Sequence, residues 1–137
     1  MAEVALRREG SVLWITLNKP DKFNAADAAM HQAFVDIWPM IDRDPAVRVA
    51  VITGAGKAFS AGGDLDRVKN AYGDHDEIVA ILEEARDIVY NMLRCSKPII
   101  SAVNGVAVGA GVVVALLSDI CIMAESARLA DGHHRLG

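Results

Sequence analysis

Two glycine-rich stretches in this chain have little side-chain bulk and could offer backbone N–H groups to a ligand. Residues 54–65 follow one β-branched run, and residues 104–111 follow another short apolar run. The second stretch leads into an apolar segment with the pattern of a helix, whose first N–H groups lack partners within the helix. Glycine and alanine let a ligand approach such groups closely, and the positive end of a helix favours an anionic oxygen. The two stretches therefore indicate a binding site for a negatively charged oxygen.

A third candidate for chemistry lies near the end of the sequence, where Asp131, His133 and His134 are close together. Histidine titrates near neutral pH and carries protons readily, and a nearby carboxylate can orient its ring. The cluster is equally consistent with a turn at Asp131 and Gly132 followed by two solvated histidines. Both interpretations stay open, and either histidine is a candidate.

The elements that must position these groups alternate between strand and helix patterns. Residues 49–53 and 98–103 have the pattern of buried strands, and residues 109–117 that of an apolar helix. In an open α/β sheet, the loops that follow parallel strands meet at one edge. We therefore expect the two glycine-rich stretches to lie together, as the two amides of an oxyanion hole would.

Further elements complete an α/β pattern. Strands are expected at 4–8, 12–17, 120–124 and 128–130, the first two forming a hairpin. One helix is expected after Asn24, which we predict as its N-cap with Asp27 in a capping-box variant. A second helix is expected after a cap pair of Asp74 and Glu77, with a core stripe along residues 78–93. Residues 65–74 are polar, and we expect a mobile connection there.

Composition narrows the function classes. The chain has 137 residues, 53% of them apolar, and a formal net charge of −4 without a basic run, which gives no case for nucleic acid. The apolar run at 106–117 is too short to span a membrane, and the charged N-terminus does not resemble a signal peptide. Cys95 and Cys121 are isolated in apolar settings, and we expect buried, reduced thiols in a cytoplasmic protein. No metal or redox cofactor is implied.

The order and spacing of short motifs along nearly the whole chain resemble the enoyl-CoA hydratase/isomerase, or crotonase, superfamily. The matching motifs are Asn18-Lys19-Pro20, Asn24-Ala25, Asp44-Pro45-Ala46-Val47-Arg48, Thr53-Gly54, Ala58-Phe59-Ser60-Ala61-Gly62-Gly63-Asp64-Leu65, Lys97-Pro98, Asn104-Gly105, Gly109-Ala110-Gly111 and Ser118-Asp119-Ile120. The resemblance implies an α/β fold with the crotonase ββα spiral core over residues 1–137. Members of this superfamily are substantially longer, so we expect a chain that is incomplete and lacks their C-terminal helical region. The resemblance also implies that the full-length protein forms a homotrimer or hexamer.

The same resemblance implies a site for an acyl-CoA thioester and a place in fatty acid metabolism. It assigns the oxyanion amides to Gly63 and Ala110, with coenzyme A present only as part of the substrate. Substrate contacts are implied at Lys22, Asn24, Ala25, Ala61, Gly62, Asp64, Leu65 and Gly109. Lys22 or Lys57 could meet a phosphate group, or either could be a solvated loop lysine.

Two positions depart from the pattern of hydratases in this superfamily, which use two glutamates to activate water. The first position is Val113, which cannot transfer a proton, and the second is His133. We expect an enzyme that stabilises a thioester enolate without the usual glutamate pair. An alternative is a β-diketone hydrolase that uses histidine and aspartate, since Asp131, His133 and His134 resemble that branch. Another is a non-catalytic acyl-CoA-binding paralogue, which Val113 favours.

Overall fold

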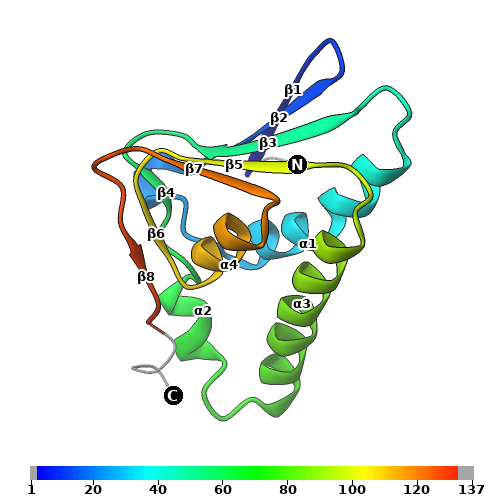
Figure 1. The fold of residues 1–137 in the computed structure, drawn as a ribbon. Coiled ribbons are helices and arrows are strands. Elements are labelled where there is room, and N and C mark those ends of the chain that lie inside the picture. The colour runs from blue at the N-terminus through cyan, green and yellow to red at the C-terminus, as the bar shows by residue number, and fades with distance from the viewer. Residues whose placement is uncertain (1–2, 133–137) are drawn as a thin grey trace.

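A computed structural model describes residues 3–132 and shows a layered α/β fold with two sheets (Figure 1). The larger sheet has the strand order β1-β2-β3-β5-β7, and only its first pair is antiparallel. These strands are β1 (Val4–Glu9), β2 (Val12–Leu17), β3 (Val49–Gly54), β5 (Ile99–Val103) and β7 (Ile120–Met123). The predicted hairpin is confirmed, because β1 pairs with β2 around a turn in which Gly10 has φ +58°.

The smaller sheet is parallel and consists of β4 (Ala58–Ser60), β6 (Val106–Val108) and β8 (Leu129–Ala130), in that order. Each consecutive pair of strands, β3–β4, β5–β6 and β7–β8, places one strand in each sheet, and a helix follows the first two pairs. This order is the predicted ββα repeat. The sequence analysis treated the residues of β4 and β6 as loops, which was wrong. Strands of three residues are too short to show the alternation that identifies a strand.

The main core lies between the larger sheet and α1 (Ala28–Arg43), which begins at the capping residue Asp27. Phe34, Ile37, Trp38 and Ile41 recur at helical spacing and are all at most 1% exposed. Burying side chains of this size contributes roughly 1.5–3 kcal/mol each. The helix is therefore the scaffold on which the preceding loop is held.

The N-cap of α1 differs from the prediction. The side chain of Asp27 accepts a hydrogen bond from the Met30 amide at 3.0 Å, whereas Asn24 is fully buried with φ +54°. The Asn24 amide group donates to the carbonyl oxygens of Ala55 and Ala58, both at 2.9 Å, and its Oδ1 accepts from the amide of Lys19. Asn24 thus ties together three backbone segments instead of capping the helix. A long-range role of this kind leaves no local sequence signal.

The expected mobile connection after residue 64 is instead helical. Asp64 caps α2 (Leu65–Asn70), since its carboxylate accepts from the amides of Asp66 and Arg67 at 2.9 and 3.2 Å. Asp74 caps the next helix, α3 (His75–Arg94), as predicted, and accepts from the amides of Asp76 and Glu77. Capping by aspartate at both positions satisfies N–H groups that would otherwise lack partners.

The predicted core stripe of α3 is only partly buried. Ile88 and Met92 are 3% and 4% exposed, but Ile78 and Leu82 in the N-terminal half are 41% and 63% exposed. Figure 1 shows the reason, because the N-terminal part of α3 extends away from the larger sheet, together with α2. The apolar spacing is correct for a helix, but the N-terminal half of α3 has no sheet to pack against.

The last helix, α4 (Ala110–Leu117), follows β6 as expected, and β7 lies at the edge of the larger sheet. All four residues of β7 are exposed. The prediction of two buried thiols was therefore wrong for Cys121, whereas Cys95 is partly buried, and burial raises its pKa.

Candidate functional site

A cavity of about 610 Å³ opens between the two glycine-rich loops and the helices α2 and α3. Its volume is within the range of pockets that hold small organic ligands. The lining is mainly apolar or glycine, and His31 of α1 also reaches it. The lining residues are His31, Ala61, Gly62, Gly63, Leu65, Val68, Ala71, Tyr72, Ile78, Ile81, Leu82, Val108, Gly109, Ala110 and Gly132.

The two loops meet as predicted, but the strands that bring them together are those of the smaller sheet. The first loop follows β4, the second follows β6, and these strands are parallel neighbours. Gly62 has φ +87°, and a Cβ atom at this position would lie 2.6 Å from the carbonyl oxygen of Val108. Only glycine permits both the backbone conformation and this approach. The close contact between the loops explains why the first has no side chain at position 62.

The amide N–H of Gly63 points away from the neighbouring segment that contains Ala26. Ala26, just before α1, forms a parallel bridge with Gly63. The Ala26 amide donates to the Gly62 carbonyl at 2.7 Å, and the Asp64 amide donates to the Ala26 carbonyl at 3.0 Å. In a parallel bridge, a residue bonded through both of its neighbours directs its own N–H to the opposite side. The Gly63 amide is therefore left for a group other than Ala26.

The amide of Ala110 is the first of α4. Gly109 precedes it with φ 52°, and no side chain caps the helix. The first intrahelical bond runs from the Val113 amide to the Gly109 carbonyl at 3.1 Å, so the Ala110 amide has no partner within the helix. A Cβ atom on Gly111 would lie 2.9 Å from the carbonyl oxygen of Ser60, so the start of the helix lies tight against β4.

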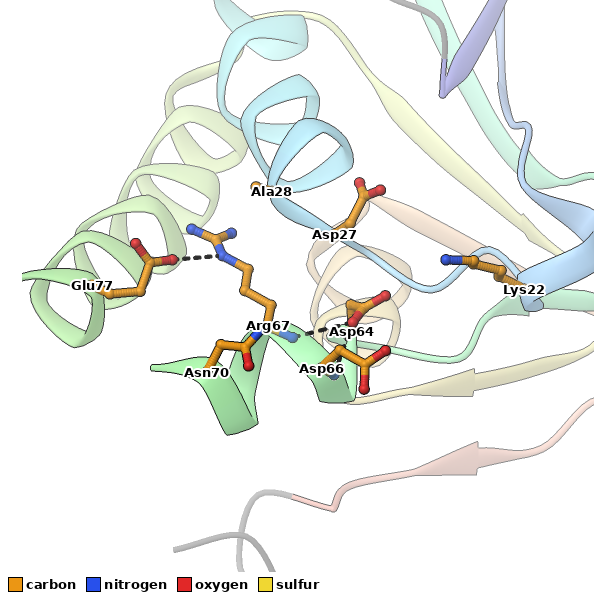
Figure 2. Close-up of a pocket in the computed structure, with 8 residues that line it drawn as sticks. All are labelled: Lys22, Asp27, Ala28, Asp64, Asp66, Arg67, Asn70 and Glu77. Atoms are coloured by element: carbon orange, nitrogen blue, oxygen red, sulfur yellow. Dashed lines mark hydrogen bonds and ion pairs between the residues drawn. The ribbon is translucent and has the colours of Figure 1, made fainter. Parts of the chain in front are cut away.

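The other residues predicted to contact substrate are divided among three environments. Ala61, Gly62, Leu65 and Gly109 line the cavity with the two amides. Lys22 and Asp64 line a separate polar hollow of about 460 Å³ instead, together with Asp27, Ala28, Asp66, Arg67, Asn70 and Glu77 (Figure 2).

Asn24 lies in neither hollow, because its side chain is fully buried in the hydrogen bonds described above. The Ala25 amide donates to the Lys22 carbonyl at 3.0 Å. Lys57, the other candidate for a phosphate contact, is exposed. Asp27, which lines the polar hollow, forms an ion pair with Lys19. Burial alone would raise the pKa of Asp27, but bonds from Lys19 and the Met30 amide outweigh it and lower the pKa.

The predicted proton-transfer cluster is only partly described. Gly132 lines the cavity and Asp131 beside it is exposed, while His133 and His134 lie outside the described residues. Val113 lies on α4, one turn after Ala110. Within the described residues, the chain therefore reaches the cavity at Gly132. Helix α4 contains no carboxylate side chain that could lie in the cavity.

Sequence analysis missed an ionic network beside the cavity. His31 Nδ1 lies 2.7 Å from a carboxylate oxygen of Glu84, and Arg67 donates to both oxygens of that carboxylate at 2.9 and 3.2 Å. The Arg67 Nε also donates to Glu77 at 3.0 Å (Figure 2). One signal was available, since His31 falls between the buried positions Met30 and Phe34 on the apolar side of α1. The partners on α2 and α3 have no such signal.

The pKa shifts of Glu84 and Arg67 both favour the charged forms of these side chains. Burial alone would raise the pKa of Glu84, but hydrogen bonds from Arg67 and His31 outweigh it and hold that pKa below its ordinary value. The bond to Glu84 is likewise the main reason that the pKa of Arg67 is raised. Both groups are therefore charged at neutral pH, and the network links α1, α2 and α3 around one wall of the cavity.

This fold and this pair of loops match known proteins. The sequence model for Enoyl-CoA hydratase/isomerase matches residues 7–137. The chain belongs to the enoyl-CoA hydratase/isomerase family. The resemblance inferred from the motifs, to the crotonase superfamily, is thereby confirmed. No helix in the part of this family member that the structure describes is both long and apolar enough to cross a bilayer.

Solved and curated relatives agree with this assignment to the enoyl-CoA hydratase/isomerase family. The crystal structure of an enoyl-CoA hydratase/isomerase from Mycobacterium paratuberculosis superposes with a TM-score of 0.93 at 44% identity, covering 97% of this chain and 53% of that one. The 1,2-epoxyphenylacetyl-CoA isomerase of Escherichia coli is 37% identical over 94% of this chain and 50% of its own length. The 2,3-dehydroadipyl-CoA hydratase of the same species is 36% identical, over 93% and 49%. The chain spans about half the length of these relatives.

Proposed function

We propose that this protein binds an acyl-CoA thioester with the thioester oxygen between the amides of Gly63 and Ala110, and that it acts through an enolate. One observation carries the proposal. Two loops that each leave a backbone amide without a local partner open into the same apolar cavity. Two fixed donors stabilise the negative charge that develops on the oxygen, and each such donor contributes about 2.7–4 kcal/mol.

The rest of the cavity suits the acyl group. Leu65, Val68 and Ala71 of the α2 region face Ile78 and Ile81 of α3 across a space of about 610 Å³. An acyl chain placed there gains by leaving water, at roughly 0.8 kcal/mol per methylene group. Coenzyme A would enter only as part of the substrate, and Lys22, on the adjacent polar hollow, remains a candidate for one of its phosphates.

The reaction itself belongs to hydratase or isomerase chemistry, as the names of the relatives suggest. Val113 stands where the resemblance places the first glutamate of a hydratase, so we propose that the usual glutamate pair is not used. Asp131, His133 and His134 are the candidates to transfer protons, since Gly132 within this segment lines the cavity. We further propose a cytoplasmic homotrimer or hexamer active in fatty acid metabolism.

Two alternatives each have one feature in their favour. A β-diketone hydrolase would use the segment from Asp131 to His134, which begins at the cavity. A non-catalytic acyl-CoA-binding paralogue would explain Val113. The hydrolase predicts consumption of a diketone with weak CoA binding, and the paralogue predicts thioester binding without turnover.

The test is hydration of crotonyl-CoA by the purified protein, followed through the loss of the conjugated thioester absorbance, with calorimetric binding of butyryl-CoA measured in parallel. We expect binding, and turnover that falls when His133 is changed to alanine. Binding without turnover on any enoyl-CoA would favour the paralogue. Absence of binding would contradict the proposal, and a diketone panel would then test the hydrolase.

A further inference from the structure

His31 is a polar group in a cavity that is otherwise lined almost entirely by apolar side chains and glycine. It lies on the first turn of α1, its amide donates to the Asp27 carbonyl at 2.9 Å, and it is 8% exposed. The other ring-bearing polar side chain of the lining, Tyr72, is 80% exposed and so lies largely in solvent. Within the described residues, His31 is therefore the buried titratable side chain that a ligand in the cavity would meet.

The ring of His31 is held in one orientation. A carboxylate only accepts hydrogen bonds, so Nδ1 of His31 carries the proton in its 2.7 Å contact with Glu84. Arg67 holds Glu84 through both of its carboxylate oxygens, which fixes that partner. A partner that holds one ring nitrogen also sets the tautomer and direction of the other. Nε2 is therefore the nitrogen left for a ligand, and no hydrogen bond joins it to another of the described residues.

A purely hydrocarbon acyl chain would be a poor match for this nitrogen. Filling the cavity with such a chain removes water from Nε2 and offers no replacement, and a buried polar atom without a partner is costly. An oxygen on the acyl chain would replace the water. A site built to hydrogen-bond such an oxygen discriminates against the analogue that lacks it.

The charges around His31 indicate which oxygen group fits. Glu84 and Glu77 carry two negative charges, and Arg67 compensates only one of them. The cavity lining itself contributes no charged side chain among the described residues. A carboxylate on the acyl chain would thus enter a region of net negative charge when the His31 ring is neutral, whereas a hydroxyl group carries no charge. A hydroxyl also donates to a bare Nε2 and accepts from a protonated one.

We propose that His31, oriented by Glu84 and Arg67, determines substrate specificity by binding a hydroxyl group on the acyl chain beyond the carbons that react next to the thioester, so that the substrates carry this additional hydroxyl group. This inference rests on the proposed function, since it requires the acyl group to occupy the cavity. It adds a substrate class to that function and assigns His31 a contact with substrate.

The test compares calorimetric dissociation constants of hexanoyl-CoA with those of 4-, 5- and 6-hydroxyhexanoyl-CoA. For the wild-type protein we expect at least one hydroxy isomer to bind roughly 5- to 150-fold more tightly than hexanoyl-CoA, the range for satisfying one buried polar atom. His31→Leu should abolish this preference and bind hexanoyl-CoA at least as tightly as wild type does. His31→Gln keeps a hydrogen-bonding side chain and should retain part of the preference. His75→Leu changes an exposed histidine outside the cavity and should keep all of it.

Equal binding of all four thioesters to the wild-type protein would overturn the role of His31 while leaving the proposed function intact. The same holds if the preference survives in His31→Leu. If none of the thioesters binds, the proposed function fails and this inference fails with it. The wild-type comparison stands without any variant, and His31→Met, which also lacks a ring nitrogen, replaces His31→Leu if the leucine variant does not fold.

Discussion

The two loops of the cavity present similar backbone amides but support them in different ways. The loop after β4 is held by the parallel bridge between Gly63 and Ala26. Ala26 belongs to a segment more than thirty residues earlier in the chain. The loop after β6 is held by helix α4, because Ala110 is the first residue of this helix. The first amide depends on a tertiary contact, and the second depends on the start of a helix. The two loops should therefore respond differently to the same kind of substitution.

The largest effect is expected from Ala110→Pro. Proline at the first helical position is well tolerated, because its missing N–H would have no partner in the helix and its fixed φ suits a helix start. The substitution removes the proposed donor and should lower kcat about 10²- to 10³-fold. The free energy of unfolding should stay within about 0.5 kcal/mol of wild type. Steady-state kinetics with the best thioester and urea denaturation measure the two quantities.

Ala110→Ser is the matched control for this variant, since it retains the amide. It should keep most of the activity. If Ala110→Pro and Ala110→Ser turn over equally well, the second amide has no part in the reaction, and the two loops do not share one role.

Gly62→Ala comes next and tests how tightly the loops fit together. An alanine there would adopt φ near +87° with its Cβ atom 2.6 Å from the Val108 carbonyl oxygen. We expect a loss of about 2–4 kcal/mol in the free energy of unfolding from backbone strain and overpacking. Gly63→Ala is the control, because a Cβ atom at Gly63 meets nothing within 4 Å. Urea denaturation should show it within about 1 kcal/mol of wild type, and similar losses for both variants would contradict this account of the first loop.

A smaller, pH-dependent effect on stability is expected from Glu84→Gln. This substitution weakens the contact between Arg67 of α2, the helix after the first loop, and α3. The pKa of Glu84 is lowered in the folded protein, so its ionised form stabilises the fold above the ordinary glutamate pKa. This contribution is lost as the pH falls through the lowered pKa. Glu84→Gln should therefore be less stable by about 1–2 kcal/mol at neutral pH, and the difference should shrink on acidification below about pH 4.

Glu83→Gln serves as the control for this prediction, since Glu83 is the exposed neighbour of Glu84. Its stability should follow that of wild type at both pH values. A constant difference between Glu84→Gln and wild type from neutral to acidic pH would mean that the charge of Glu84 does not stabilise the contact between α2 and α3.

Sequence reasoning recovered the features whose causes are local. The glycines at 62 and 111 mark close approaches that only small residues allow, and the cap of α3 follows from Asp74 and the residues after it. The order of the motifs also identified the family. The family resemblance assigned Gly63 and Ala110 to one site from the sequence alone, and both residues line the same cavity.

The features that sequence reasoning missed depend on partners distant in the chain. Asn24 is read naturally as a helix cap until its bonds to Ala55 and Ala58 are seen. The strands β4 and β6 are three residues each and exist because they pair with one another. The contact between His31 and Glu84 spans 53 positions, and the stabilising Arg67 comes from a segment whose polar sequence suggested mobility.

The pairing within the smaller sheet has a consequence for the order of folding. The Gly109 amide, next to the proposed donor Ala110, donates to the Ala130 carbonyl at 3.2 Å, and the Ala107 amide donates to the Arg128 carbonyl at 2.9 Å. During synthesis, the segment before α4 lacks its outer partner strand until residue 130 has left the ribosome. The nascent chain thus contains every strand of its larger sheet before the segment that leads into Ala110 has its outer partner strand.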